Sequence, residues 1–206
     1  DGGPGAGSSK ELEALPPVAI SIDDAVSCGR LHETRHCIVD RDPDAALARD
    51  DLVKVSGTVR IGGQEHFYLE CNAALAIPGE GGREMEVFAS TQTTTKTHKF
   101  AAQVCGLAES RVVVRMKRMG GAFGGKETRS VFASTAVALA AHRLNVPVRI
   151  NLDRDVDMLA TGTRHPFQGK YRCAADRETG KIVAVDIELY SNAGFSTDLS
   201  ESVMDR

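Results

Sequence analysis

The segment that most constrains the fold is a strand, a glycine-rich loop and a helix in direct succession. An apolar run in "RVVVRMKRM" predicts the strand, "GGAFGGKE" follows it, and an Ala- and Val-rich stretch predicts a helix over residues 128–144. Four glycines within six residues indicate a backbone that takes positive φ or lies close to other atoms; they are Gly120, Gly121, Gly124 and Gly125. At a helix N-terminus, such a loop presents N–H groups and the positive end of the helix dipole to an anion.

The same loop nearly matches the phosphate-binding loop of nucleotide-binding proteins. Gly120, Gly125 and Lys126 fit that pattern, but Glu127 stands where Ser or Thr would hold magnesium. A carboxylate there would repel phosphate oxygens by about 1–4 kcal/mol per charge pair at roughly 4 Å. A nucleotide-binding module that uses Gly120–Lys126 is therefore an alternative that its own chemistry disfavours.

The rest of the chain alternates between strand and helix patterns, which predicts an α+β (mixed α/β) fold, a mixed sheet with flanking helices. A strand over residues 15–22 should lead into a helical turn capped by Ser21 or Asp23, and residues 40–51 read as a polar connector with helical character. Further strands are expected in "VKVSGTVRI", "FYLECNAALAI", "EMEVFAS" and "VPVRINL", and a hairpin over residues 171–190 should turn at Glu178–Lys181. A helix over residues 94–107 should be capped by Thr94 and carry one apolar face of Phe100, Val104 and Leu107.

Composition narrows the class of protein. The chain has 206 residues, 42% of them hydrophobic and 26% charged, which is typical of a globular protein. A net charge of −3 with 5% aromatic residues and no Trp argues against nucleic acid as a partner. The apolar run over residues 131–141 is far shorter than the roughly 20 residues that cross a membrane. The five cysteines show no spacing typical of disulfides, zinc or iron–sulfur clusters.

The composition also shifts along the chain. Residues 2–9 form a Gly/Ser/Pro tract typical of a linker, and the pattern changes near residue 40. We therefore expect residues 1–40 to be the tail of a preceding domain plus a flexible linker, and residues 41–206 to be the first part of another domain. Because the chain opens on Asp1 and closes on "SESVMDR", we expect a piece of a longer polypeptide.

A second glycine motif precedes one of the predicted strands. Gly62 and Gly63 come directly before Gln64, whose side chain can donate and accept hydrogen bonds at once. The nearby His66, and His165 before a proline, have no neighbours at metal-ligand spacing. We expect both histidines to be structural.

Long motifs in this chain resemble the molybdenum-binding region of the xanthine dehydrogenase/oxidase family of molybdenum hydroxylases. They are "IGGQEHFYLE", "VVVRMKRMGGAFGGKETRS", "LDRDVDMLATGTRHPF" and "DLSESVMDR", in this order. The resemblance extends from about residue 50 to residue 206 and implies part of a molybdopterin-binding domain. It also implies that Glu127 belongs in the glycine loop. Two departures are Ala122, where the xanthine enzymes more often carry glycine, and an extra residue around Asp176–Glu178.

The resemblance implies roles for five residues. Gln64 and Phe123 would lie beside the metal, Gln64 through its amide and Phe123 through its backbone N–H, with Gly124 next to the molybdopterin. Glu127 would hydrogen-bond a purine substrate, and Arg206 would stabilise the negative charge that develops on the purine ring. Aldehyde oxidases generally lack the last two, so xanthine dehydrogenase is preferred over aldehyde oxidase.

The resemblance also implies what the intact protein would do. It would oxidise hypoxanthine and xanthine to urate in purine catabolism, with [2Fe-2S] clusters, FAD and the catalytic general base outside this chain and NAD or O2 as electron acceptor. The expected state is a homodimer, cytoplasmic or peroxisomal, and this chain alone would be inactive. A catalytically silent scaffold domain is the remaining alternative.

Overall fold

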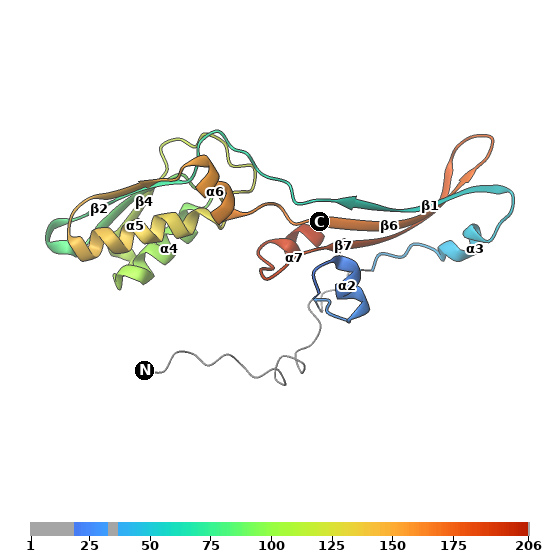
Figure 1. The fold of residues 1–206 in the computed structure, drawn as a ribbon, viewed down its shortest axis with the longest axis horizontal. Coiled ribbons are helices and arrows are strands. Elements are labelled where there is room, and N and C mark those ends of the chain that lie inside the picture. The colour runs from blue at the N-terminus through green and yellow to red at the C-terminus, as the bar shows by residue number, and fades with distance from the viewer. Residues whose placement is uncertain (1–18, 33–36, 206) are drawn as a thin grey trace, which may run out of the picture. The chain divides into compact units, whose positions relative to one another are not determined.

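The computed structural model describes residues 19–32 and 37–205, which form two compact units (Figure 1). Unit 1 comprises residues 1–62 and 165–206, and unit 2 comprises residues 63–164. The chain therefore enters unit 2 after Gly62 and leaves it after Arg164, so that unit 2 is an insertion within unit 1.

Unit 1 is built on an antiparallel sheet of three strands in the order β1-β6-β7. The strands are β1 (Leu52–Ile61), β6 (Phe167–Asp176) and β7 (Ile182–Ser191). The described part of unit 1 also contains the short helices α2 (Ile22–Ser27), α3 (Pro43–Leu47) and α7 (Ser200–Met204). Ser21 caps α2 in a capping box with Asp24, as expected. The predicted hairpin joins β6 to β7, and the Asp176 carboxylate accepts hydrogen bonds from the backbone N–H groups of Glu178 and Thr179. The extra residue near 176–178 therefore lies in a turn that its own side chains stabilise.

Unit 2 contains a mixed sheet of four strands in the order β4-β3-β2-β5. The strands are β2 (Ala73–Pro78), β3 (Met85–Ala89), β4 (Val112–Arg115) and β5 (Val148–Asn151). Only the β3–β4 pair is parallel. The helices are α4 (Thr94–Cys105), α5 (Ser130–Leu144) and α6 (Arg154–Thr161), with the short 3-10 helices η1 (Glu80–Gly82) and η2 (Glu109–Arg111).

The core of unit 2 lies between its sheet and the helices α4 and α5. Small side chains dominate it, and Ala76, Ala101, Ala138 and Ala141 are fully buried together with Val87. Side chains without long branches allow the backbones of α4, α5 and the sheet to approach closely. The predicted α+β class is thus confirmed, although it is divided into two sheets.

Several predicted boundaries are wrong. The strand expected over residues 67–77 begins only at Ala73, because Phe67 takes a left-handed φ of +45° and Tyr68 and Asn72 turn inward. Helix α4 begins after Thr93 rather than being capped by Thr94. The expected strand in residues 111–119 ends at Arg115, and α5 begins two residues after Thr128.

The apolar stripe predicted for α4 is not its buried face. Phe100 and Val104 are 41% and 38% exposed, whereas Ala101, Ala102 and Cys105 are buried. Small residues face α5 because the two helices pack closely. The strand expected near residues 15–22 lies mostly outside the described residues, and the domain boundary near residue 40 stays a prediction.

Candidate functional site

The glycine loop between β4 and α5 packs against the segment that precedes β2. A Cβ atom on Gly125 would lie 2.7 Å from Tyr68 Cε1 and 2.8 Å from His66 Cγ, so no side chain fits there. Gly124 has a φ of +94°, which glycine adopts without strain. Ala122 is buried and has no positive φ, so the loop accepts the methyl group that distinguishes it from the family pattern.

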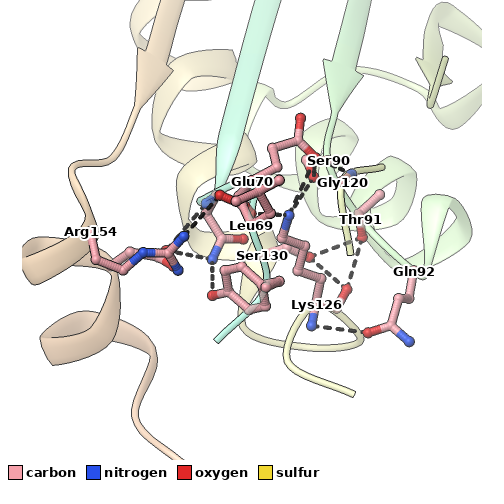
Figure 2. Close-up of polar contacts among 12 residues, drawn as sticks. Leu69, Glu70, Ser90, Thr91, Gln92, Gly120, Lys126, Ser130 and Arg154 are labelled. Carbon is pink, nitrogen blue, oxygen red and sulfur yellow. Dashed lines mark hydrogen bonds and ion pairs between the residues drawn. The ribbon is translucent and has the colours of Figure 1, made fainter. Parts of the chain in front are cut away.

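Lys126 anchors the loop to Glu70 and Ser90 (Figure 2). Its side chain is fully buried, and its ammonium group donates to the Glu70 carbonyl at 2.7 Å and to Ser90 Oγ at 2.8 Å. The Glu70 carboxylate lies 3.4 Å from the same nitrogen, which also sits 4.4 Å from the centre of the Tyr68 ring. Burial lowers the pKa of Lys126, and Glu70 opposes that shift.

Glu70 ties the start of the loop to the same network. Its carboxylate accepts hydrogen bonds from the Gly120 N–H at 2.8 Å and from Ser90 Oγ at 2.7 Å, and its own N–H donates to the Gly120 carbonyl. Burial works to raise the pKa of Glu70, but these hydrogen bonds and Lys126 hold it below its ordinary value. The carboxylate therefore stays ionised and holds both ends of the loop.

Gln92 accepts hydrogen bonds from two backbone N–H groups of the glycine loop. Its side-chain Oε1 accepts hydrogen bonds from the N–H groups of Gly124 and Lys126, both at 3.1 Å (Figure 2 draws the second). Its backbone N–H donates to the Lys126 carbonyl at 2.9 Å. The N–H groups of Gly124 and Lys126 are thus used internally, and the Lys126 amine is buried against Glu70 and Ser90. The nucleotide-binding alternative therefore has no geometric support.

Arg164 brings together two of the residues expected beside the metal. Its Nη1 donates to Gln64 Oε1 at 3.1 Å, its Nη2 donates to the Phe123 carbonyl at 2.5 Å, and its backbone N–H donates to the Gln64 carbonyl at 3.0 Å. Gln64 and the Phe123–Gly124 segment, far apart in the sequence, are therefore joined through one guanidinium group. Phe123 takes a left-handed φ of +52° and its side chain is 63% exposed.

Three groups at this site have no partner within the described residues. No described residue accepts a hydrogen bond from the Phe123 N–H or from the Gln64 Nε2, and the half-buried Glu127 carboxylate forms no hydrogen bond or ion pair with a described residue. Arg206 lies outside the described residues, so its expected place opposite Glu127 stays a prediction.

The two histidines have different surroundings. The His66 ring stacks on Tyr68 at 6.4 Å between ring centres, and its buried Nδ1 has no hydrogen-bond partner among the described residues. Burial lowers the pKa of His66, and the positive charge of Arg164 lowers it further. In unit 1, the His165 Nδ1 forms a hydrogen bond with Ser200 Oγ.

Sequence reasoning missed the residues that organise this site. Arg164 lies within one of the long motifs, but the resemblance gave it no role. Gln92 precedes α4, and no sequence pattern indicates its contact with the glycine loop. Lys126 was considered only as a phosphate ligand. Helix α6 was also missed, although Asp153 before it and Gly162 after it are ordinary start and stop signals.

Within residues 19–32 and 37–205, no helix is long and apolar enough to cross a membrane and no cluster of three metal-binding side chains occurs. All five cysteines are described, and none forms a disulfide.

Comparisons with known proteins agree with these motifs. The chain is 48% identical over 196 residues to a xanthine dehydrogenase of Dictyostelium discoideum, and 51% identical over 191 residues to a xanthine dehydrogenase/oxidase of Rattus norvegicus. These alignments cover 95% and 92% of this chain but only 14% of each relative. The resemblance stated from the sequence is thereby confirmed, and the chain spans about a seventh of the length of these curated relatives.

Solved structures show the same fold. The aldehyde oxidoreductase from Desulfovibrio gigas matches with a TM-score of 0.67 and 24% identity, over 79% of this chain and 17% of that one. A CO dehydrogenase from Oligotropha carboxidovorans matches with a TM-score of 0.60 and 22% identity, over 71% of this chain and 18% of that one. The family model of the molybdopterin cofactor-binding domain matches residues 31–206. The chain therefore belongs to the molybdopterin cofactor-binding domain family.

Proposed function

We propose that this chain is part of a molybdenum hydroxylase that oxidises hypoxanthine and xanthine to urate, and that unit 2 lines its cofactor and substrate site. The observation that carries the proposal is the Arg164 bridge, which brings Gln64 and Phe123 together and leaves the Gln64 Nε2 and Phe123 N–H groups without acceptors among the described residues. A side-chain amide and a backbone N–H that lack acceptors among the described residues, and whose residues are linked through one guanidinium group, suit an electron-rich group supplied by a bound cofactor.

The residues present fit a molybdenum–molybdopterin cofactor. Gln64 and Phe123 would hold it by donating hydrogen bonds through the side-chain amide and the backbone N–H. Gly124 would contribute differently, because its N–H is given to Gln92 and nothing lies within 4 Å of where its Cβ would be. Its lack of a side chain leaves room for the cofactor. When bound, the cofactor supplies the oxygen transfer and takes two electrons from the substrate.

Glu127 and Arg206 would read the purine. A carboxylate that forms no hydrogen bond or ion pair with a described residue, at the point where the loop enters α5, can accept a hydrogen bond from a ring N–H and orient the heterocycle. A guanidinium on the other side would stabilise negative charge that develops on the ring during hydroxylation. The general base is proposed to lie outside this chain.

The xanthine relatives support further proposals for the intact protein. We infer [2Fe-2S] clusters and FAD in other domains, electron transfer to NAD or O2, a homodimer, and a cytoplasmic or peroxisomal location. An aldehyde oxidase is the second candidate. Glu127 and Arg206, together with about 50% identity to xanthine enzymes, favour the purine over an aldehyde.

The test replaces the two purine-reading residues in the intact protein. Glu127→Val and Arg206→Met should each lower kcat/KM for xanthine by about 30- to 1000-fold, because each removes a charge-assisted contact made in the transition state. An aromatic aldehyde has no purine ring to orient and should lose much less. Glu80→Val, an exposed carboxylate in η1, is the matched control and should leave both substrates unchanged.

Molybdenum content is measured on each protein. An equal fall for xanthine and the aldehyde would show that Glu127 and Arg206 do not read the purine. Absence of molybdenum from the purified wild type would overturn the assignment to this class of enzyme.

A further inference from the structure

The dipeptide of His165 and Pro166 holds both ends of the segment that joins β7 to α7. The Pro166 carbonyl accepts a hydrogen bond from the Asn192 N–H at 2.9 Å, directly after β7. The His165 Nδ1 forms a hydrogen bond with Ser200 Oγ, at the first residue of α7. We propose that His165 is a positioning residue, which fixes α7 and thereby directs Arg206, two positions after the last residue of that helix, to the purine. This inference rests on the proposed function, to which it adds a residue without an assigned role.

The dipeptide is stiff for reasons that lie in its own sequence. The proline ring fixes the φ of Pro166, and its Cδ restricts the preceding residue, His165, to extended backbone. Strand β6 begins at the next residue, Phe167, and pairs with both β1 and β7. The half-buried His165 ring is therefore carried on a backbone that the proline and the sheet restrain together.

The segment between β7 and α7 benefits from such a support, because two of its residues have left-handed backbone. Gly194 has a φ of +60°, and Asp198 has a φ of +41°, a value that is uncommon for a residue with a side chain. The hydrogen bond from the Gly194 N–H to Asn192 Oδ1, at 3.1 Å, shapes the first turn of the segment. A hydrogen bond within the segment cannot attach it to the sheet, whereas the contacts of the dipeptide can.

Helix α7 is short and exposed, so its direction is easily changed. It has five residues, none of them buried, and Val203 is 55% exposed. Packing therefore contributes little to holding the helix, and single polar contacts matter more. At about 1.5 Å per residue the helix is roughly 7.5 Å long, so a tilt of about 15° displaces its end by about 2 Å. A displacement of about 1 Å can cost about 100-fold in rate.

The proposed role of Arg206 makes the contact between His165 and Ser200 specific for one class of substrate. Arg206 would stabilise negative charge on a purine ring, and an aromatic aldehyde has no such ring. A displaced α7 should therefore harm the oxidation of a purine more than that of an aldehyde. Loss of the fold would harm both reactions alike, so the two substrates separate positioning from stability.

The experiment removes each partner of the hydrogen bond in the intact, molybdenum-loaded protein. Ser200→Ala and His165→Phe delete the hydrogen bond, and Ser200→Thr keeps the hydroxyl group. Thr197→Ala, which removes an exposed hydroxyl group three positions before Ser200, is the matched control. The value of kcat/KM per bound molybdenum is measured with xanthine and with an aromatic aldehyde. Amide hydrogen exchange of residues 199–205 is followed by mass spectrometry.

We expect Ser200→Ala and His165→Phe each to lower kcat/KM for xanthine by about 5- to 30-fold and to change that for the aldehyde by less than about 3-fold. Exchange of the α7 amides should become at least about 5-fold faster, because local opening becomes easier. The double variant should fall no further than either single one, since both substitutions remove the same contact. Ser200→Thr and Thr197→Ala should stay within about 3-fold of wild type in every measurement.

A second pair of variants tests whether the effect passes through Arg206. In an Arg206→Met background, Ser200→Ala should lower kcat/KM for xanthine by less than about 2-fold, because the guanidinium group that it would displace is already absent. A fall in that background as large as in wild type would overturn the proposal.

Unchanged exchange in both Ser200→Ala and His165→Phe would also overturn it, and so would an equal fall for xanthine and the aldehyde. If His165→Phe does not fold, Ser200→Ala carries the test, because it removes the other partner of the same hydrogen bond. The exchange measurement needs neither molybdenum nor substrate. A wild type without molybdenum or purine oxidation would therefore contradict the proposed function, while the exchange result would still decide whether His165 holds α7.

Discussion

Lys126 shows how a residue that fits a familiar motif can serve a different purpose. In a phosphate-binding loop the lysine reaches outward to the nucleotide. Here its ammonium group is buried against Glu70, Ser90 and the Tyr68 ring, and it holds the loop to the segment before β2. The difference follows from the acceptors that the fold provides beneath the loop, and the loop sequence does not contain them.

Removal of this ammonium group should loosen the loop. Lys126→Met leaves the Glu70 carbonyl and Ser90 with one partner fewer, and we expect a loss of about 1–3 kcal/mol in the local free energy of opening. Native-state hydrogen exchange over residues 119–127 measures it. Lys99→Met, at an exposed position of α4, should change that free energy by less than about 0.5 kcal/mol. Equal effects of the two substitutions would contradict the role of Lys126.

His66 should make the stability of the fold depend on pH. Burial lowers its pKa below the ordinary 6.5, so the unfolded chain binds a proton more readily than the folded one. Stability should therefore decrease as the pH falls through about 6.5 and level off below the pKa of the folded state. The thermal unfolding midpoint, followed from pH 7.5 to pH 5.5, should fall less in His66→Asn than in wild type. The same pH dependence in both proteins would show that another group is responsible.

The site residues differ in how far the sequence could predict them. Gln64, Phe123, Gly124 and Glu127 stand in long motifs, so the resemblance assigned them roles, and the structure joins Gln64 to Phe123 through Arg164. The partnership of Arg164 with Gln64 spans 100 positions of sequence. No local pattern encodes a contact at that separation, and only the folded path of unit 2 creates it.

At the level of elements, strands and helices were predicted best where neighbouring residues alone decide them. The hairpin β6–β7 and the glycine loop before α5 have strong local signals and occur as expected. The start of β2 and the buried face of α4 were predicted wrongly, because tertiary packing overrides the local pattern there. Tyr68 and Asn72 are buried polar residues outside any strand, and α4 buries alanines rather than Phe100.

Packing between α4, α5 and the sheet should be sensitive to added volume. Ala138 in α5 is fully buried, and Ala138→Leu should lower the free energy of unfolding by about 1–3 kcal/mol, because the added atoms must displace the residues packed around it. Leu139 is 39% exposed on the same helix, and Leu139→Met should cost less than about 0.5 kcal/mol. Urea denaturation of the two variants makes the comparison, and similar midpoints would argue against close packing at α5.

For the whole chain, the insertion of unit 2 into unit 1 gives two crossing points, after Gly62 and after Arg164. The residues nearest these points, Gln64 and Arg164, hydrogen-bond to each other through backbone and side chain. The proposed site is therefore formed where unit 2 begins and ends. No composition or periodicity predicts such an insertion, because each sheet draws strands from distant parts of the sequence.

The whole chain should not bind nucleotide. Gln92 accepts the N–H groups of Gly124 and Lys126 in the glycine loop, the Lys126 side chain is buried, and the net charge of −3 offers no general attraction for phosphate. Isothermal titration with magnesium-ATP should give no binding tighter than about 1 mM, which corresponds to about −4 kcal/mol. Micromolar binding that Lys126→Met abolishes would contradict the internal use of this lysine and revive the nucleotide alternative.

The left-handed backbone at Phe123 has a consequence for how this sequence can diverge. Glycine would adopt the positive φ at that position with the least strain, but it would remove the exposed aromatic ring. A function that needs the ring therefore favours phenylalanine at position 123, whereas the left-handed backbone there favours glycine. In a lineage that no longer needs the ring, we expect position 123 to drift to glycine or asparagine sooner than Gly125, which any side chain would bring into collision with Tyr68.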